Sequence, residues 1–183
     1  MKIKTGIKSY KSNEEKEVDK EILTLFNNCP IPENQLMENL GLFLNAKNFS
    51  RILFMHHIYK NIIEVPGVIM DFGTRWGNNL ALFSIFRGIY EPFNRHRKLI
   101  GFDTFTGFPS INKKDGDSEL MNKGNVSCTE DYDKYLDKIM ELQEMQNPIS
   151  HIKKYEIRKG DSVIEVQNYL KEYPETIVAL AYF

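Results

Sequence analysis

Residues 66–109 constrain the fold more than any other part of the chain. An apolar run at 68–70 ends in the acid Asp71, two glycines follow, and a segment with a helical pattern comes next. A second apolar run, at 99–102, leads to Asp103. Strand, acid, glycine turn, helix, strand and acid in this order are typical of a nucleotide-type cofactor site at the carboxyl ends of parallel strands.

The rest of the sequence continues an alternation of helices and strands. One or two helices are expected within 33–63, with Asn45 as an N-cap, and an apolar helix at 78–90 is expected to be buried on nearly all sides. Strands are expected at 155–158 and at 176–183, the latter with the continuous apolar character of a central parallel strand. This order predicts an α/β fold with a mostly parallel sheet and helices on both faces.

The chain divides by composition into two parts. Residues 1–20 are polar with little periodicity and predict a loose arm, so 1–65 is expected to be an arm with a helical segment and 66–183 a Rossmann-like domain. Two capping boxes, Ser127-x-x-Glu130 and Ser162-x-x-Glu165, predict helix starts within that domain. Residues 110–126 are charged and aperiodic, which predicts a long surface loop of the kind that often forms a lid.

The sequence stops at the end of its most hydrophobic strand. In this architecture functional groups lie just beyond the carboxyl ends of strands, and an open apolar edge needs a partner. We therefore expect the chain to be the N-terminal part of a longer protein, with the domain truncated after its fourth strand.

Composition excludes several classes of function. The formal net charge is -1 with acids and bases interspersed, so no nucleic-acid partner is expected. No apolar run is long enough to span a bilayer, and the N-terminus lacks the apolar core of a signal peptide. Cys29 and Cys128 form neither a redox pair nor a zinc site, and they are expected to be free thiols in a reducing cytoplasm.

The turn after the first expected strand carries the first candidate site. Gly73 lets the chain turn sharply off the strand, and Gly77 lets a ligand approach the start of the next helix, whose free N–H groups favour a carboxylate or phosphate. The G-x-x-x-G spacing suits S-adenosylmethionine better than a dinucleotide, with the ammonium of the amino acid near Asp71. Thr74 and Asn78 belong to the same turn and are included as cofactor-binding candidates.

Two further segments complete the candidate cofactor site. Asp103 ends the second expected strand and could accept hydrogen bonds from both ribose hydroxyls, with Thr104 beside it; an N-cap of the next turn is the alternative. Asp161 and Ser162 could meet an adenine edge, and a plain helix start is an equal alternative. His56 and His57 lie on one helix without an i, i+4 partner, so no metal site is indicated.

The segments PGVIMDFGTRWGNN, KLIGFDTFTGFP and KGDSVIEV together resemble the macrocin O-methyltransferase family, the TylF/MycF-like sugar methyltransferases. The resemblance covers about residues 34–183 and implies a Rossmann-like class I methyltransferase sheet with an N-terminal helical segment. It also implies that these segments hold S-adenosylmethionine. The chain departs from the family pattern at Asp71, where Glu is usual, and at Thr74-Arg75-Trp76-Gly77-Asn78, where V-W-R-G-G is usual.

The resemblance further implies a small-molecule substrate whose sugar hydroxyl attacks the sulfonium methyl in line, and a Mg²⁺ ion that holds that hydroxyl. In the family the metal acids and the catalytic base follow the fourth strand, so the catalytic residues are unknown here and the Mg²⁺ ligands are expected beyond Phe183. A homo-oligomer is left open. The alternative functions are a nucleotide- or NAD-binding oxidoreductase, a CoA-transferase and a non-catalytic fragment.

Overall fold

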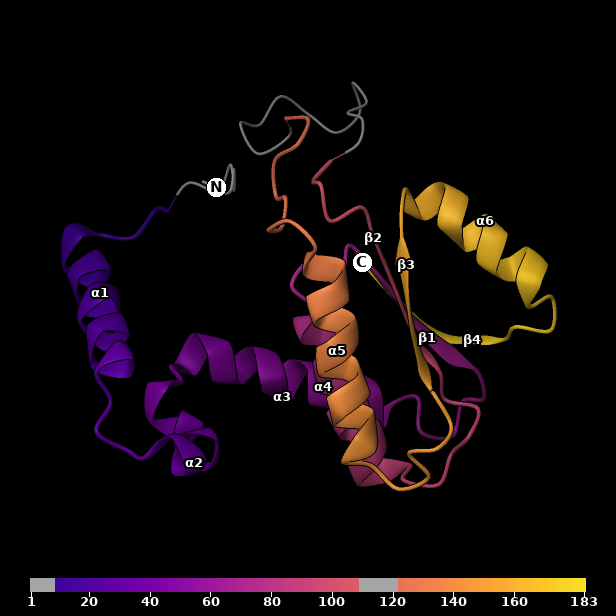
Figure 1. Ribbon diagram of the computed structural model, residues 1–183, viewed down its shortest axis with the longest axis horizontal. Helices are drawn as coiled ribbons and strands as arrows, with labels where there is room; N and C mark the ends of the chain where they lie inside the picture. Colours follow the sequence, from indigo (N-terminus) through magenta and orange to yellow (C-terminus); the bar gives the residue numbers. More distant parts are fainter. Residues whose placement is uncertain (1–8, 109–121) are drawn as a thin grey trace. The chain divides into compact units, whose positions relative to one another are not determined.

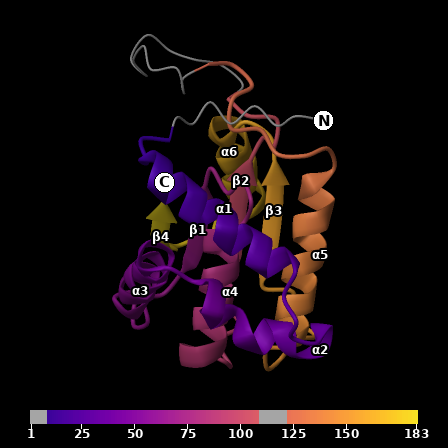
Figure 2. The ribbon, with the colours of Figure 1, turned by 90° about the vertical axis from the view of Figure 1, so that its left-hand side faces the viewer.

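The computed structural model describes residues 9–108 and 122–183, and its centre is a four-stranded parallel sheet. The strands are β1 (Val68–Phe72), β2 (Leu99–Asp103), β3 (Tyr155–Lys159) and β4 (Val178–Tyr182), in the order β3-β2-β1-β4. Figure 2 shows the four strands side by side, and all three neighbouring pairs are parallel. Their carboxyl ends therefore lie at the same edge of the sheet.

Helices cover both faces of this sheet. Figure 1 shows α4 (Asn78–Tyr90) and α5 (Tyr132–Met145) on one face and α6 (Ser162–Glu172) on the other. The α/β class, the parallel sheet and the two helical layers predicted from the sequence are therefore confirmed. Helix α4 also has the bounds expected from its apolar pattern.

The core is built from the two sides of the strands. On the face covered by α6, four buried residues form one cluster: Met70, Ile100, Phe102 and Tyr169. Four partly buried residues pack against this cluster: Val68, Phe72, Val166 and Tyr173. On the other face the buried residues of α4 and α5 include Leu80, Phe83, Leu136 and Met140. The alternation along β1 and β2 sends successive side chains to opposite layers, as a strand covered on both faces requires.

A buried ionic cluster fixes α4 and α5 to the start of β3. Arg87 on α4 donates from Nη2 to Glu144 Oε2 on α5 at 2.7 Å, and Lys154 Nζ lies 2.6 Å from Glu144 Oε1. Arg87 Nη1 also donates to the carbonyl oxygen of Lys154 at 2.8 Å. All three side chains are almost completely buried, so each charge depends on its partners within the cluster.

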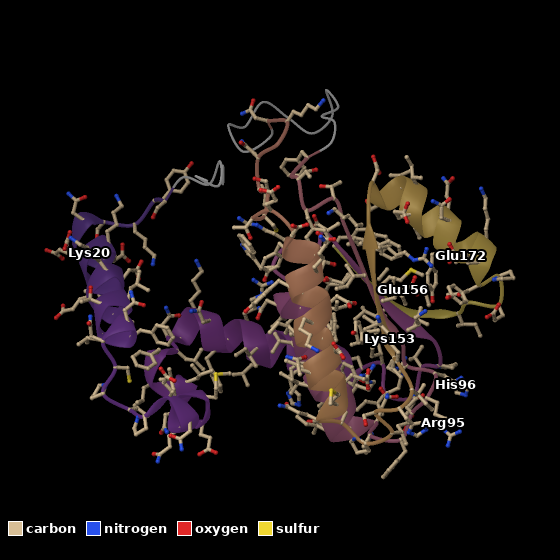
Figure 3. The ribbon with its side chains drawn as sticks, viewed as in Figure 1. Lys20, Arg95, His96, Lys153, Glu156 and Glu172 are labelled. Carbon is tan, nitrogen blue, oxygen red and sulfur yellow. The ribbon has the colours of Figure 1, made fainter. Side chains whose placement is uncertain are left out.

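Helix α6 is held to the sheet by a partly exposed polar cluster. Lys98 Nζ lies 2.5 Å from Glu156 and 4.4 Å from the centre of the Tyr173 ring. Arg158 on β3 donates to Glu172 on α6 at 2.9 Å through Nη1. Figure 3 labels Glu156 and Glu172, which come from the two elements that this cluster joins.

Residues 8–54 form a separate compact unit, and the second unit includes residues 55–183. The first unit holds α1 (Asn13–Asn27), α2 (Glu33–Leu36), the 3₁₀ helix η1 (Met37–Phe43) and the first part of α3 (Ala46–Lys60). The expected N-cap of α3 is present, because Asn45 Oδ1 accepts a hydrogen bond from the backbone N–H of Asn48 at 2.8 Å.

Four sequence expectations are wrong in detail. Residues 13–20 belong to helix α1 instead of a loose arm. Helix α5 begins after Asp131, with no side-chain cap from Ser127, and α6 is capped by Asp161 instead of Ser162. Ile85 and Ile89 on α4 are exposed, so that helix is not buried all round. Most of the expected lid, 109–121, lies outside the described residues.

Candidate functional site

The turn after β1 contains two glycines with the same backbone geometry and different surroundings. Gly73 has φ +73° and Gly77 has φ +74°, a conformation that favours glycine. A Cβ on Gly77 would lie 2.2 Å from Cδ1 of Leu136 on α5, whereas a Cβ on Gly73 would meet no atom within 4 Å. Gly77 therefore serves the packing of α4 against α5, and Gly73 leaves room for a ligand.

Asp103 lies at the end of β2, beside this turn. Its Oδ2 accepts a hydrogen bond from the backbone N–H of Arg75 at 2.7 Å, and its Oδ1 accepts one from the N–H of Phe105 at 2.6 Å. The carboxylate thus caps the following turn and also ties the end of β2 to the glycine turn after β1. A carboxylate has about four lone-pair positions, so both oxygens keep acceptor capacity for a ligand.

The segment after β2 is fixed by its own polar contacts. Thr104 Oγ1 donates to the carbonyl oxygen of Gly107 at 2.6 Å. Gly107 has φ +86°, and a Cβ there would lie 2.3 Å from the carbonyl oxygen of Asn125. The D-T-F-T-G-F sequence therefore forms a tight turn whose glycine, Gly107, cannot be replaced without moving the chain at 124–125.

The end of β3 brings a third segment to the same edge. The backbone N–H of Gly160 donates to the carbonyl oxygen of Asp103 at 2.9 Å. Asp161 is the N-cap of α6, and its Oδ1 accepts a hydrogen bond from the N–H of Val163 at 2.9 Å. The helix-start alternative is thus realised, and Asp161 still lies at the edge of the cavity described next.

These segments surround a pocket of about 400 Å³ at the carboxyl edge of the sheet. Gly73, Asp103, Thr104, Asp161 and Ser162, five of the candidates from the sequence, line it. The other described lining residues come from the strand ends and the neighbouring turns: Phe72, Arg75, Phe102, Gly107, Phe108, Val126, Gly160 and Phe183.

The remaining four candidates do not line the pocket among the described residues. Asp71 is fully buried, and its Oδ1 accepts a hydrogen bond from Asn79 at 3.3 Å. Thr74 is buried and donates to the carbonyl oxygen of Asp71 at 2.9 Å. Gly77 faces Leu136, and Asn78 is the exposed first residue of α4. These residues shape and support the turn in the structure.

An aromatic row lines the pocket and was not found from the sequence. The rings of Phe72 and Phe102 stack with centroids 4.9 Å apart, and Phe183 stacks on Phe72 at 4.8 Å. The available signal was position, because Phe72 and Phe102 close the two apolar runs beside Asp71 and Asp103. Such a row offers an apolar wall to a flat or aliphatic ligand group.

Arg75 and Trp76 have clear positions although the sequence left them open. Arg75 has φ +48°, and the carbon of its guanidinium lies 5.4 Å from the centre of the Trp76 ring. Trp76 packs edge-to-face on Tyr132 at 4.7 Å and accepts a hydrogen bond at its carbonyl oxygen from the Tyr132 hydroxyl. Trp76 therefore packs against α5 and does not line the described pocket.

The Cys128 thiol is not activated as a nucleophile. Burial raises the pKa of the Cys128 thiol to about 11, and the charge of Asp103 acts in the same direction, so this thiol is protonated at neutral pH. Within 9–108 and 122–183 no three His, Cys, Asp or Glu side chains gather as metal ligands. No helix of that part of the chain is long and apolar enough to cross a membrane.

The arrangement suits a ligand with several polar parts and one flat part. The open turn at Gly73 leads into the start of α4, Asp103 offers a fixed carboxylate, and the Phe72–Phe102–Phe183 row supplies an apolar wall. A nucleoside with a charged tail has this distribution of groups.

Comparison with solved structures gives two strong matches. The crystal structure of CalS11, a calicheamicin methyltransferase, is 38% identical with a TM-score of 0.92, and the match covers 96% of this chain and 68% of that one. The apo structure of CalS11, described as a TDP-rhamnose 3'-O-methyltransferase in calicheamicin biosynthesis, is 35% identical with a TM-score of 0.81, covering 96% and 67%. No family model and no curated protein matches the chain.

Proposed function

The chain belongs to the family of S-adenosylmethionine-dependent sugar O-methyltransferases to which CalS11 belongs, and from this membership we propose that its acceptor is a hydroxyl of a nucleotide-linked deoxysugar. Membership of this family favours methyl transfer over the oxidoreductase and CoA-transferase alternatives. We further propose that the chain is of the TylF/MycF-like type, because the segments that carry that resemblance form the pocket edge.

The observation that carries the proposal is the pocket at the ends of β1, β2 and β3. We assign the ribose hydroxyls to Asp103, whose carboxylate is already oriented by two backbone N–H groups. The carboxylate of the amino-acid tail fits the open turn at Gly73 and the N-terminus of α4, where unpaired N–H groups favour an anion. We assign the adenine to the part of the pocket lined by Asp161, Ser162 and the aromatic row.

When bound, S-adenosylmethionine supplies an electrophilic methyl group on a sulfonium. The residues of this chain bind and orient the cofactor, and much of the rate of an in-line transfer comes from such positioning. Asp71 and Thr74 act below the turn, where their mutual hydrogen bond holds its shape. The described residues do not form a Mg²⁺ site, so no step of the proposal passes through a metal ion.

We also propose that the protein works in the cytoplasm. Both cysteines are free, and Cys29 is only half-buried, as is usual in a reducing compartment.

The proposal is tested by calorimetry with S-adenosylhomocysteine and by methyl transfer to TDP-rhamnose and to the free sugar. We expect the full chain to bind the cofactor product with micromolar affinity, and Asp103→Ala to weaken it at least about tenfold. Asp137→Ala, an equal change at an α5 residue that pairs with Lys153 and does not line this pocket, is the matched control and should leave the affinity unchanged. Absence of binding by the wild-type chain, or equal affinities for both variants, would overturn the proposed site.

A further inference from the structure

Arg75 is the only basic side chain among the described residues that line the pocket at the ends of β1, β2 and β3. The other charged residues of this lining, Asp103 and Asp161, are acids. The proposed cofactor contacts involve these acids, Ser162 and the turn at Gly73, and they leave Arg75 without a role. Its presence in the lining therefore needs an explanation of its own.

Other buried arginines of this chain meet a carboxylate within the fold. Arg87 Nη2 lies 2.7 Å from Glu144 Oε2, and Arg97 Nε lies 2.9 Å from Glu91 Oε2. Arg75 forms no ion pair with a described residue, and its buried Nε has no hydrogen-bond partner among them. A charged N–H group that is removed from water without an acceptor costs free energy. The guanidinium of Arg75 therefore keeps donors that the described fold does not satisfy.

Asp103, the acid beside Arg75, is bound to main-chain groups instead of to the guanidinium. Its Oδ2 accepts the backbone N–H of Arg75 at 2.7 Å, and its Oδ1 accepts the N–H of Phe105 at 2.6 Å. In the described part of the chain no ion pair joins the side chains of Asp103 and Arg75. The positive charge of Arg75 therefore remains available to a ligand in the pocket.

Arg75 is held in place before a ligand binds. Its φ of +48° is a left-handed conformation that a side chain of this size rarely adopts, and the hydrogen bond from its N–H to Asp103 fixes it. The carbon of its guanidinium lies over the Trp76 ring at 5.4 Å, which allows a cation–π interaction. The Trp76 ring in turn packs edge-to-face on Tyr132 of α5. A strained backbone that its surroundings hold in this way is typical of binding sites.

The shape of the guanidinium limits what it can bind. Because one side of it lies over the Trp76 ring, its N–H groups are available mainly at its edge, in the plane of the group. A planar fork of N–H groups matches two oxygens of one anion, as in a carboxylate or a phosphate. Ribose and adenine are neutral and do not use this charge. The expected partner is therefore an oxyanion.

We propose that Arg75 binds an oxyanion of a ligand in this pocket and so helps to determine which ligands the pocket accepts. The inference rests on the proposed function, in which two such groups come to the site: the tail carboxylate of S-adenosylmethionine and the diphosphate of a nucleotide-linked sugar. The open turn at Gly73 and the start of α4 supply only partial charges from backbone N–H groups, and Arg75 adds a full positive charge to the same turn.

Calorimetry of the wild type and of Arg75→Gln tests the carboxylate. S-adenosylhomocysteine carries the tail carboxylate, and 5′-methylthioadenosine lacks the amino-acid tail. If the carboxylate is the partner, Arg75→Gln weakens S-adenosylhomocysteine at least about tenfold, because charge-assisted hydrogen bonds are lost. The affinity for 5′-methylthioadenosine then stays within about twofold of the wild-type value.

Thymidine diphosphate and thymidine, titrated in the presence of saturating S-adenosylhomocysteine, test the diphosphate. If the diphosphate is the partner, Arg75→Gln weakens thymidine diphosphate at least about tenfold and leaves thymidine and S-adenosylhomocysteine unchanged. Either pattern supports the proposal, and the pattern observed identifies the source of the oxyanion.

Two further variants separate binding from folding. Arg75→Gly removes the same charge and suits the φ of +48°, so it should fold and reproduce the loss. Arg95→Gln removes an exposed charge outside the described pocket lining and should change no affinity; Figure 3 labels this residue.

Two results would overturn the proposal while leaving the proposed function intact. One is an equal loss for ligands with and without the oxyanion, which indicates a purely structural role. The other is wild-type affinity for every ligand in both Arg75 variants. A wild-type chain that binds neither S-adenosylhomocysteine nor thymidine diphosphate would overturn the proposed function as well.

Discussion

Gly73 and Gly77 are four residues apart and have nearly equal φ angles, but their surroundings differ. A Cβ at Gly77 would overlap another side chain, and a Cβ at Gly73 would not. At Gly77 it would strike Leu136, so Gly77→Ala should lower the free energy of unfolding by about 2–4 kcal/mol through backbone strain and overpacking. At Gly73 only the strain of about 1–2 kcal/mol applies. Urea unfolding of both variants measures this difference.

The variants Gly73→Ala and Gly77→Ala also distinguish an effect on stability from an effect on cofactor binding. Gly73→Ala places a methyl group in the pocket and should weaken S-adenosylhomocysteine at least about tenfold in calorimetry. Gly77→Ala, measured below its unfolding transition, should bind nearly as the wild type does. Equal losses of affinity in the two variants would contradict the different roles assigned to these glycines.

Cys128 gives a pH-dependent prediction. Burial raises the pKa of its thiol from 9.0 to about 11, so between these values the unfolded chain loses a proton that the folded chain keeps. The stability that this thiol contributes is complete below pH 9 and is lost as the pH rises towards 11. Cys128→Ala should therefore show a shallower loss of stability over this range, as measured by urea midpoints. Identical slopes for variant and wild type would refute it.

Sequence reasoning at the residue scale found the acids better than the glycines. Asp103 and Asp161 were correctly predicted to follow strands, because an expected strand and the acid after it can be recognised in the sequence alone. The packing of Gly77 against Leu136 was not predicted, because Leu136 lies on another helix, 59 positions further along the chain. The cofactor roles of all nine candidates stay predictions.

Helix α5 depends on a buried charge, that of Glu144. Glu144→Gln removes the anion that faces both Arg87 and Lys154, and unpaired buried charges cost about 3–5 kcal/mol. Chemical denaturation should show this loss. Glu141→Gln on the same helix breaks an exposed pair with Lys138 and should cost less than about 0.5 kcal/mol. Comparable losses in both variants would show that the cluster is not stabilising.

The strands and most helices could be predicted, and the helix caps could not. Apolar runs bounded by turns locate β1 and β2 within a residue or so, because burial on both faces leaves a strong pattern. Asp161 and Ser162 are both acceptable caps, and only the backbone conformation selects Asp161. The helix within the expected arm did leave a signal, since Ser12 and Glu15 form a complete capping box.

For the whole molecule, the two units differ in how their amides should be protected. Among the described residues, every buried one lies at or after Met55, so residues 13–54 should exchange amide hydrogens faster than β1 and β2. Hydrogen exchange followed by mass spectrometry measures this difference. Equal exchange rates in α1 and in the two strands would contradict it.

Sequence reasoning also had limits at this scale. The parallel sheet followed from the alternation of elements, but the strand order β3-β2-β1-β4 did not follow from the apolar runs. A continuous apolar sequence indicates that both faces of a strand are buried. It does not indicate which strands are its neighbours, because strand order depends on how the chain connects the elements.

The two amide contacts of Asp103 have a kinetic consequence. Arg75 and Phe105 hold its carboxylate in place without any ligand, so a molecule that binds there finds an acceptor that needs no reorientation. The association rate is then governed by diffusion into the pocket instead of a slow local rearrangement. The difference between a tight and a weak ligand would accordingly appear in how long each stays bound.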